Sequence, residues 1–185
     1  MPTRSPSTAA IPSSWCIPLA KLTIRETVLF GILGALTFAG KYVMQGLPNI
    51  EPVSLMIMLF AVTFGLKGIY PMYVYVVMEF LFYGLNTWSV CYLYIWLVLL
   101  LLALAFRKME GTLGWALLSG VFGLGFGALC APVDVAIGGF GYALSKWSSG
   151  IPFDILHCAG NFAMALLLFK PLRKLLTQLY AKLEK

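Results

Sequence analysis

Long apolar runs, separated by short breaks that contain polar residues, glycine or proline, make up most of this chain. A helix needs about 20 apolar residues to cross a bilayer core about 30 Å thick. Read in this way, the pattern predicts six transmembrane helices, at about residues 26–44, 53–66, 70–85, 88–106, 111–131 and 150–170. The predicted fold class is therefore an all-α membrane protein, a bundle of six transmembrane helices.

Two stretches indicate how the first and second of these helices begin. Thr23 and Glu26 have the spacing of a capping box, so we expect a helix to begin just after Thr23. The run 53–66 is short for a complete crossing, about 21 Å at about 1.5 Å per residue. We therefore expect the loop 47–51 before it to dip into the outer leaflet and to bring its polar residues close to the other polar groups.

The later breaks in the pattern are less regular. Pro132 is expected to kink or end the fifth helix, and the loop 138–150, which contains four glycines, to lead into the sixth. The last segment, 174–185, is short, basic and amphipathic, and is expected to lie on the membrane surface. The chain is thus divided into an N-terminal cytoplasmic tail (1–22), a six-helix transmembrane domain (23–175) and a short basic cytoplasmic tail (176–185).

Composition supports the same class. Of the 185 residues, 61% are hydrophobic and 11% are charged, which excludes an ordinary soluble domain. No segment is long and polar enough for a separate catalytic or nucleic-acid-binding domain. The net charge of +6 does not indicate nucleic acid, because most basic residues flank apolar runs. The cysteines show no C-x-x-C spacing, and those in predicted helices are interpreted as small apolar residues (Cys91, Cys130 and Cys158).

The distribution of positive charge predicts the topology. Six crossings put both termini on one side of the membrane. If that side is the cytoplasm, all but two of the 13 lysines and arginines are inside, and only Lys41 and Lys146 are outside. Cytoplasmic loops carry such an excess of basic residues, so the N- and C-termini are predicted to be cytoplasmic.

This topology gathers the polar side chains of the apolar segments at the outer end of the bundle (Lys41, Asn49, Glu51, Glu79, Asn86, Asp134, Asp154, His157 and Asn161). A proton relay or an ion path needs such groups through the whole depth of the membrane. The pattern instead predicts a cup that is open to the outside and closed by an apolar floor, which suits a small polar molecule with a ring.

Roles for these residues follow as hypotheses. Asp154, His157 and Asn161 share one helix face and would hold polar groups of a ligand, while Glu51 would act as a lid or gate. Glu79 and Lys41 either contact the ligand or pair with each other. Trp88, Tyr92 and Trp96 recur at four-residue steps, and they either stack on a ring or pack in the core. The alternative for Asp154, His157 and Asn161 is a polar patch that only holds helices together.

The order of several motifs carries a resemblance to a known family. The motifs are the small residues Gly31, Ala35 and Ala39 of the first helix, Leu47-Pro-Asn-Ile-Glu51, Tyr73-Val-Tyr75 with Phe82-Tyr-Gly84, Tyr92-Leu-Tyr-Ile-Trp96, and Ile151-Pro-Phe-Asp-Ile-Leu-His157 with Asn161-Phe162. Over residues 23–175 the chain resembles the substrate-binding S components of energy-coupling factor (ECF) vitamin transporters.

The resemblance implies a high-affinity substrate-binding domain at 23–175 in a bacterial plasma membrane. Its substrate, a vitamin or cofactor precursor, would enter from the extracellular side. The face formed by Gly31, Ala35 and Ala39 would dock a transmembrane coupling subunit, which works with two ABC ATPases. The chain itself has no G-x-x-x-x-G-K-[ST] motif for ATP, and we expect no catalytic residue, metal or cofactor in it.

Two other classes of function compete with this reading. One is a membrane-embedded hydrolase that uses Asp154 and His157 as base and orienter, with Glu79 and Asp134 completing a metal site. The chain has no evident nucleophile elbow for it. The other is a bundle with a structural or assembly role only, which leaves the outer polar residues unexplained.

Overall fold

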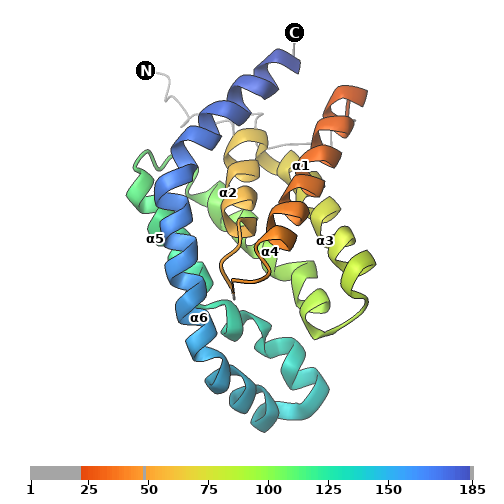
Figure 1. Ribbon diagram of the computed structural model, residues 1–185, viewed down its shortest axis with the longest axis vertical. Helices are drawn as coiled ribbons and strands as arrows, with labels where there is room; N and C mark the ends of the chain where they lie inside the picture. The colour runs from red at the N-terminus through yellow and green to blue at the C-terminus, as the bar shows by residue number, and fades with distance from the viewer. Residues whose placement is uncertain (1–21, 48, 184–185) are drawn as a thin grey trace, which may run out of the picture.

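A computed structural model describes residues 22–47 and 49–183, so most of the predicted N-terminal tail lies outside the described residues. All regular elements in these ranges are helices (Figure 1): α1 (Ile24–Val43), α2 (Val53–Phe64), the 3-10 helix η2 (Gly65–Gly68), α3 (Ile69–Tyr83), α4 (Thr87–Ala105), α5 (Thr112–Leu124) and α6 (Phe126–Leu183). The prediction of an all-α chain is confirmed for this part of the protein.

The capping box at the start of α1 is present as predicted. The Thr23 hydroxyl accepts a hydrogen bond from the backbone N–H of Glu26 (3.2 Å), and the Glu26 carboxylate accepts one from the backbone N–H of Thr23 (2.9 Å). The first four N–H groups of a helix have no partner inside it, so these bonds fix where α1 begins. Asn86 caps α4 in a similar way, accepting from the N–H of Ser89 at 3.0 Å.

The chain turns back on itself through the first half of the fold. η2 separates α2 from α3 and brings Lys67 next to Glu26, at the end of the molecule where α1 begins. At the opposite end, the last turn of α1 meets the last turn of α3 through an ion pair between Lys41 and Glu79. Figure 1 shows the start of α1 and the end of α6 at the same end of the molecule.

α5 and the second half of α6 run antiparallel and in close contact. Trp115 near the start of α5 stacks on Phe169 near the end of α6, with ring centroids 4.7 Å apart. Near the other end of α5, a Cβ placed on Gly123 would lie 2.9 Å from the carbonyl oxygen of His157. A side chain at position 123 is therefore excluded, because it would push the two helices apart.

The expectations for residues 111–150 were wrong in detail. α5 ends at Leu124, before Gly125, and Pro132 lies inside the following helix instead of ending one. The predicted loop 138–150 is helical on both sides of a single break at Gly139, whose φ of 79° is a conformation that favours glycine. Glycine costs a helix only about 1 kcal/mol per residue, so several glycines did not suffice to make a loop.

The C-terminal segment is a continuation of α6. The helix passes Pro171 and runs without a break to Leu183, so residues 174–183 form its last turns. Tyr180 packs edge-on against Phe64 of α2, with ring centroids 5.0 Å apart. This contact holds the end of α6 against the bundle.

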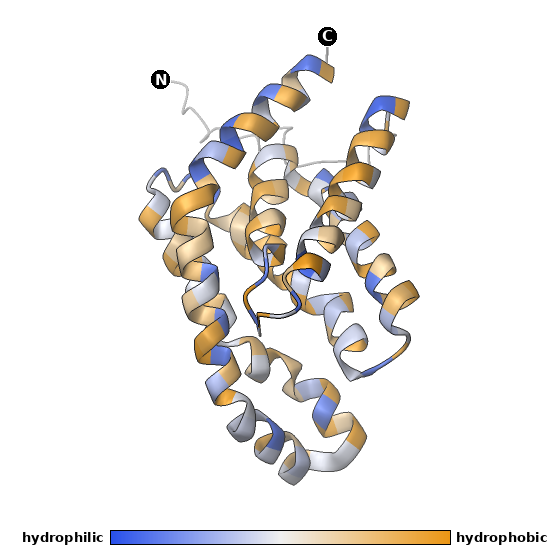
Figure 2. Ribbon diagram, in the orientation of Figure 1, coloured by the Kyte–Doolittle hydropathy of each residue, from blue (hydrophilic) through white to orange (hydrophobic). Residues whose placement is uncertain are grey.

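Within the described residues, four helical stretches are long and apolar enough to cross a membrane: Ile24–Val43, Val53–Tyr83, Thr87–Ala105 and Thr112–Leu183. Their outer surfaces carry many exposed apolar side chains, among them Val28, Ile32, Leu36, Val77, Leu81, Leu117 and Val121. Figure 2 shows hydrophobic colour along most of the helices, with hydrophilic positions near the start of α1 and the end of α6 and others in the loop between α1 and α2 and along α6. Exposed apolar surface on this scale is typical of a protein that faces lipid.

A buried polar cluster closes the end of the molecule where α1 begins, and we call it the Glu26 junction (Glu26, Thr23, Lys67 and Tyr180). One carboxylate oxygen of Glu26 pairs with Lys67 (2.5 Å) and accepts from the hydroxyl of Tyr180 (2.8 Å). The other oxygen accepts from Thr23. The junction ties α1, η2 and α6 together, and both oxygens of its carboxylate have partners.

Candidate functional site

A cavity of about 660 Å³ lies beside the last turn of α1, at the opposite end of this helix from Glu26. It is formed by the last turn of α1, the loop after it, the end of α3, the start of α4 and both halves of α6. Ten of the twelve predicted substrate-binding residues line it: Lys41, Asn49, Glu51, Glu79, Asn86, Trp88, Tyr92, Asp134, Asp154 and His157. The structure thus brings these residues together around one cavity, and their contact with a substrate stays a prediction.

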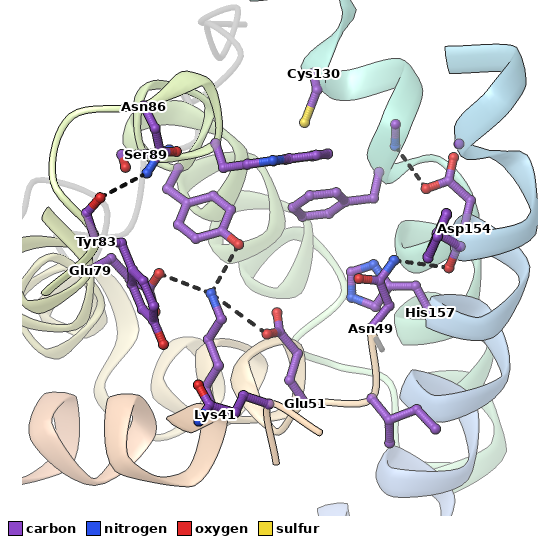
Figure 3. Close-up of a pocket in the computed structure, with 18 of the residues that line it drawn as sticks. Lys41, Asn49, Glu51, Glu79, Tyr83, Asn86, Ser89, Cys130, Asp154 and His157 are labelled. Atoms are coloured by element: carbon purple, nitrogen blue, oxygen red, sulfur yellow. Dashed lines mark hydrogen bonds and ion pairs between the residues drawn. The ribbon is translucent and has the colours of Figure 1, made fainter. Parts of the chain in front are cut away.

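Lys41 is the centre of one side of the cavity (Figure 3). Its ammonium nitrogen lies 2.9 Å from Glu79 Oε2, 3.8 Å from Glu51 Oε2 and 3.1 Å from the hydroxyl of Tyr92. It also donates to Tyr75 at 3.4 Å. We call these five residues the Lys41 cluster. Lys41 and Glu79 therefore pair with each other, one of the two roles proposed for them, while both also line the cavity.

Glu51 reaches the Lys41 cluster from the loop between α1 and α2. Burial raises the pKa of Glu51, because a charged carboxylate is poorly solvated there; the nearby Lys41 opposes this shift and Glu79 adds to it. In this loop the backbone N–H of Ile50 donates to the carbonyl oxygen of Leu47 at 3.2 Å, and Asn49 has a φ of 56°, a left-handed conformation that asparagine adopts more readily than most residues. The Asn49 side chain donates to the carbonyl oxygen of Phe153 at 3.1 Å, which connects the loop to α6.

A second ion pair lies between the two halves of α6. Lys146 pairs with Asp134 at 2.5 Å, and its ammonium nitrogen lies 5.1 Å from the centroid of the Trp88 ring. The break at Gly139 makes this pair possible, because it folds the second half of α6 back toward the first. Lys146 was not among the predicted site residues, since its segment was expected to be a loop.

Asp154 and His157 form the other side of the cavity, on α6 (Figure 3). The side chains are only 5% and 3% exposed. Asp154 Oδ1 accepts from the N–H of Gly127 at 3.2 Å, but Oδ2 has no hydrogen-bond partner among the described residues. The same holds for both ring nitrogens of His157, whose ring packs edge-on against Phe126 at 4.9 Å between centroids.

Trp96 and Asn161, the other two predicted residues, do not line the cavity. Trp96 is fully buried one helical turn below Tyr92 and packs against the rings of Tyr75, Phe122 and Phe126. It therefore belongs to the floor of the cavity. Asn161 donates to the hydroxyl of Ser54 (3.0 Å) and to the carbonyl oxygen of Ser119 (3.2 Å), which joins α2, α5 and α6 below the floor.

Sequence reasoning did not assign Tyr75, Phe126, Trp147 or Lys146 to the site. Tyr75 lies four residues before Glu79 and so shares its helix face, a signal that includes it. Trp147 and Lys146 fall in the predicted loop 138–150, and Phe126 falls in the predicted helix 111–131. All but Tyr75 line the cavity.

The small-residue face of α1 lies away from the cavity. A Cβ placed on Gly31 would meet nothing within 4 Å, whereas one on Gly34 would lie 2.6 Å from Val74 of α3. Ala35 is half-buried and Ala39 is exposed. Gly34 therefore provides the close packing between α1 and α3, and the face with Gly31, Ala35 and Ala39 is not closed at Gly31.

The cavity combines charge, aromatic rings and burial, as a binding site for a small molecule does. Among the described residues, no group of three or more His, Cys, Asp and Glu side chains is arranged to hold a metal ion. No family model matches this chain, and no curated protein or solved structure is significantly similar to it.

Proposed function

We propose that this protein is a membrane-embedded substrate-binding subunit, an S component of an ECF-type importer, that takes up a vitamin or cofactor precursor from outside the cell. One observation carries the proposal: a cavity of about 660 Å³ collects ten of the predicted polar and aromatic residues from six parts of an otherwise apolar chain. Ligand pockets commonly have volumes of about 300–1,000 Å³ with a few converging polar groups.

On this proposal the chain crosses the membrane six times. The stretch Val53–Tyr83 makes two of them, because η2 turns the chain back at its middle, and α5 and the second half of α6 make the last two. The excess of basic residues near the Glu26 junction supports a cytoplasmic position for that end. The cavity then opens to the extracellular side, and the segment of α6 on either side of Gly139 lies near the outer surface.

The floor below the cavity supports binding over conduction. Trp96, Phe122 and Phe126 pack together beneath it, and Leu99 and Leu100 are buried deeper in α4. A channel needs polar groups or water along its whole length. A substrate bound here could cross the membrane only if the whole subunit moved, and this motion is the reason for a coupling subunit and two ABC ATPases as partners.

The hydrolase alternative has less support. A base and its orienter need a hydrogen bond between them, and neither ring nitrogen of His157 has a partner among the described residues, so no such bond joins it to Asp154. A purely structural bundle would not need polar atoms left unsatisfied around a cavity, because buried polar groups that only stabilise a fold are normally hydrogen-bonded.

The test of binding uses the purified protein in lipid nanodiscs without ATP. Native mass spectrometry should detect one small molecule per chain, and its return to stripped protein should change the fluorescence of Trp88 and Trp147, which line the cavity. Absence of any bound compound, together with no fluorescence response to a panel of B vitamins and cobalamin precursors, would contradict the proposed function.

The test of docking separates binding from uptake. Ala39→Trp should leave ligand affinity unchanged and abolish uptake in cells that contain the coupling subunit and ATPases, because a large side chain prevents close helix approach. Val77→Trp, at an exposed position of α3, is the matched control and should leave uptake intact. Normal uptake by the Ala39 variant would place the docking face elsewhere.

A further inference from the structure

The two sides of the cavity differ in how far their charges are compensated. On one side Lys41 pairs with Glu79 and Glu51, and between the halves of α6 Lys146 pairs with Asp134. Asp154 is 5% exposed and has no salt-bridge partner among the described residues; one of its oxygens has no hydrogen-bond partner there either. A buried, uncompensated carboxylate costs several kcal/mol, so its retention points to a partner that arrives with the ligand.

The charge of the whole lining is negative. Four carboxylates (Glu51, Glu79, Asp134 and Asp154) and two ammonium groups (Lys41 and Lys146) line the cavity, a formal excess of two negative charges. Without the charge of Glu51 the lining would still carry an excess of one negative charge. Both ammonium groups already have carboxylate partners, so an anionic ligand would find no free cation and would be repelled in a site of low dielectric constant.

The groups beside Asp154 suit a positively charged donor. His157 offers a second polar contact, because one nitrogen of a neutral imidazole is an acceptor. Phe126 and Trp147 line the same part of the cavity, and aromatic faces attract cations. The face of Trp88, by contrast, is already occupied by Lys146.

Gly127 shapes this part of the cavity. Its N–H donates to Asp154 Oδ1, and a Cβ at this position would lie 2.5 Å from Asp154 Oδ2 and 3.0 Å from the Trp147 ring. Only glycine leaves Oδ2 in its present position beside the tryptophan. The carboxylate is therefore held by the backbone through one oxygen while the other remains for a ligand.

From this geometry we propose that the substrate is a small organic cation, a compound that carries a protonated amine or amidine on or near an aromatic ring. Its charged group binds between Asp154 and His157, and its ring lies against Phe126 and Trp147. The inference rests on the proposed function and narrows it from vitamin-like compounds in general to those with a positive charge.

The test uses three probes of nearly equal shape that differ in charge: benzamidine (cation), benzamide (neutral) and benzoate (anion). Binding to the full-length protein in nanodiscs is measured by tryptophan fluorescence and by saturation-transfer NMR. Benzamidine should bind at least tenfold more tightly than benzamide, and benzoate more weakly than either. In Asp154→Asn the preference for benzamidine over benzamide should fall below threefold, whereas Glu110→Gln, at an exposed carboxylate outside the cavity, should retain it.

The outcomes separate the two proposals. If benzoate or benzamide binds as tightly as benzamidine, or if the compound that co-purifies is neutral or anionic, the protein still binds small molecules but the cation proposal is wrong. If no probe binds, the charge of the co-purified compound tests the cation proposal: a positively charged compound supports it, and a neutral or anionic one contradicts it. If neither a probe nor a co-purified compound is found, the proposed function fails as well. The wild-type comparison needs no variant, so it holds even if Asp154→Asn does not fold.

Discussion

The Glu26 junction and the Asp154 side of the cavity are both buried sites built around a carboxylate, yet they are completed in opposite ways. Glu26 has a lysine, a tyrosine hydroxyl and its own helix cap as partners for its two oxygens. Asp154 has one backbone N–H for one oxygen, and the neighbouring His157 has no partner for either nitrogen among the described residues.

The difference follows from the elements that meet at each site. At the Glu26 junction three elements converge tightly enough for Lys67 and Tyr180 to reach the same oxygen. Near Asp154 the chain folds back at Gly139 and leaves a cavity, so no side chain fills the space beside the carboxylate. A closed polar cluster stabilises the fold, whereas an open one retains capacity for another molecule. The two sites should therefore respond differently to mutation.

The largest expected effect on folding is at the Glu26 junction. Glu26→Ala removes the carboxylate half of the capping box, while the bond from the N–H of residue 26 to the Thr23 hydroxyl remains. It also leaves Lys67 and Tyr180 without their shared oxygen, so the free energy of unfolding should fall by about 2–3 kcal/mol. Denaturant unfolding in detergent measures the change. Ligand affinity of the folded protein should not change; a tenfold loss of affinity at unaltered stability would show that the two ends are coupled.

The next effect is on binding. Asp154→Ala or His157→Ala should each weaken ligand affinity by more than tenfold, about 1.4 kcal/mol, because each removes a polar partner that the ligand needs. Stability should change little, since Asp154 Oδ2 and both nitrogens of His157 have no partner among the described residues, and only the bond from the Gly127 N–H to Asp154 Oδ1 is lost. Titration of the stripped protein with the co-purified compound provides the measurement, and unchanged affinity in both variants would refute the site assignment.

A smaller effect is expected from Tyr180→Phe. The variant loses one of several hydrogen bonds to Glu26 and keeps the ring that packs on Phe64. The free energy of unfolding should fall by about 1 kcal/mol, with no change in binding. Thermal unfolding followed by circular dichroism is sufficient here. A fall as large as that of Glu26→Ala would mean that Tyr180, and not Lys67, is the main partner of the carboxylate.

The smallest effect is expected at the floor. Trp96→Phe keeps an aromatic ring and removes an indole N–H that has no partner among the described residues, and because Trp96 does not line the cavity, ligand affinity should change by less than threefold. A loss of affinity above tenfold would return Trp96 to the substrate site, where the sequence pattern had placed it.

Much of the fold was predictable because it depends on local patterns. The limits of α1, α3 and α4 lie within two residues of the predicted ones, since apolar runs and capping residues specify where helices begin and end. Gly139 was not recognised as the single break in residues 126–183, because four glycines in one stretch look alike until packing selects which of them adopts a positive φ.

The candidate site was predictable as a collection of residues and less so as an arrangement. Asp154 and His157 share a helix face by spacing alone, and the structure places both on the cavity. Asn161, one turn further on the same face, instead donates hydrogen bonds to the Ser54 hydroxyl and the Ser119 carbonyl oxygen. The helix period predicts which side chains share a face, but neighbouring helices determine where along that face a cavity ends.

By itself the sequence determined that the chain is apolar and helical, and that its polar residues are grouped toward one end, because hydrophobic periodicity and charge distribution are properties of the chain alone. Only the tertiary structure decided which carboxylates are compensated. Lys41 and Lys146 each meet a partner 12 or more positions away, and Asp154 has no salt-bridge partner among the described residues. Such pairing depends on distances of a few ångström between separate helices, which packing sets and no local pattern encodes.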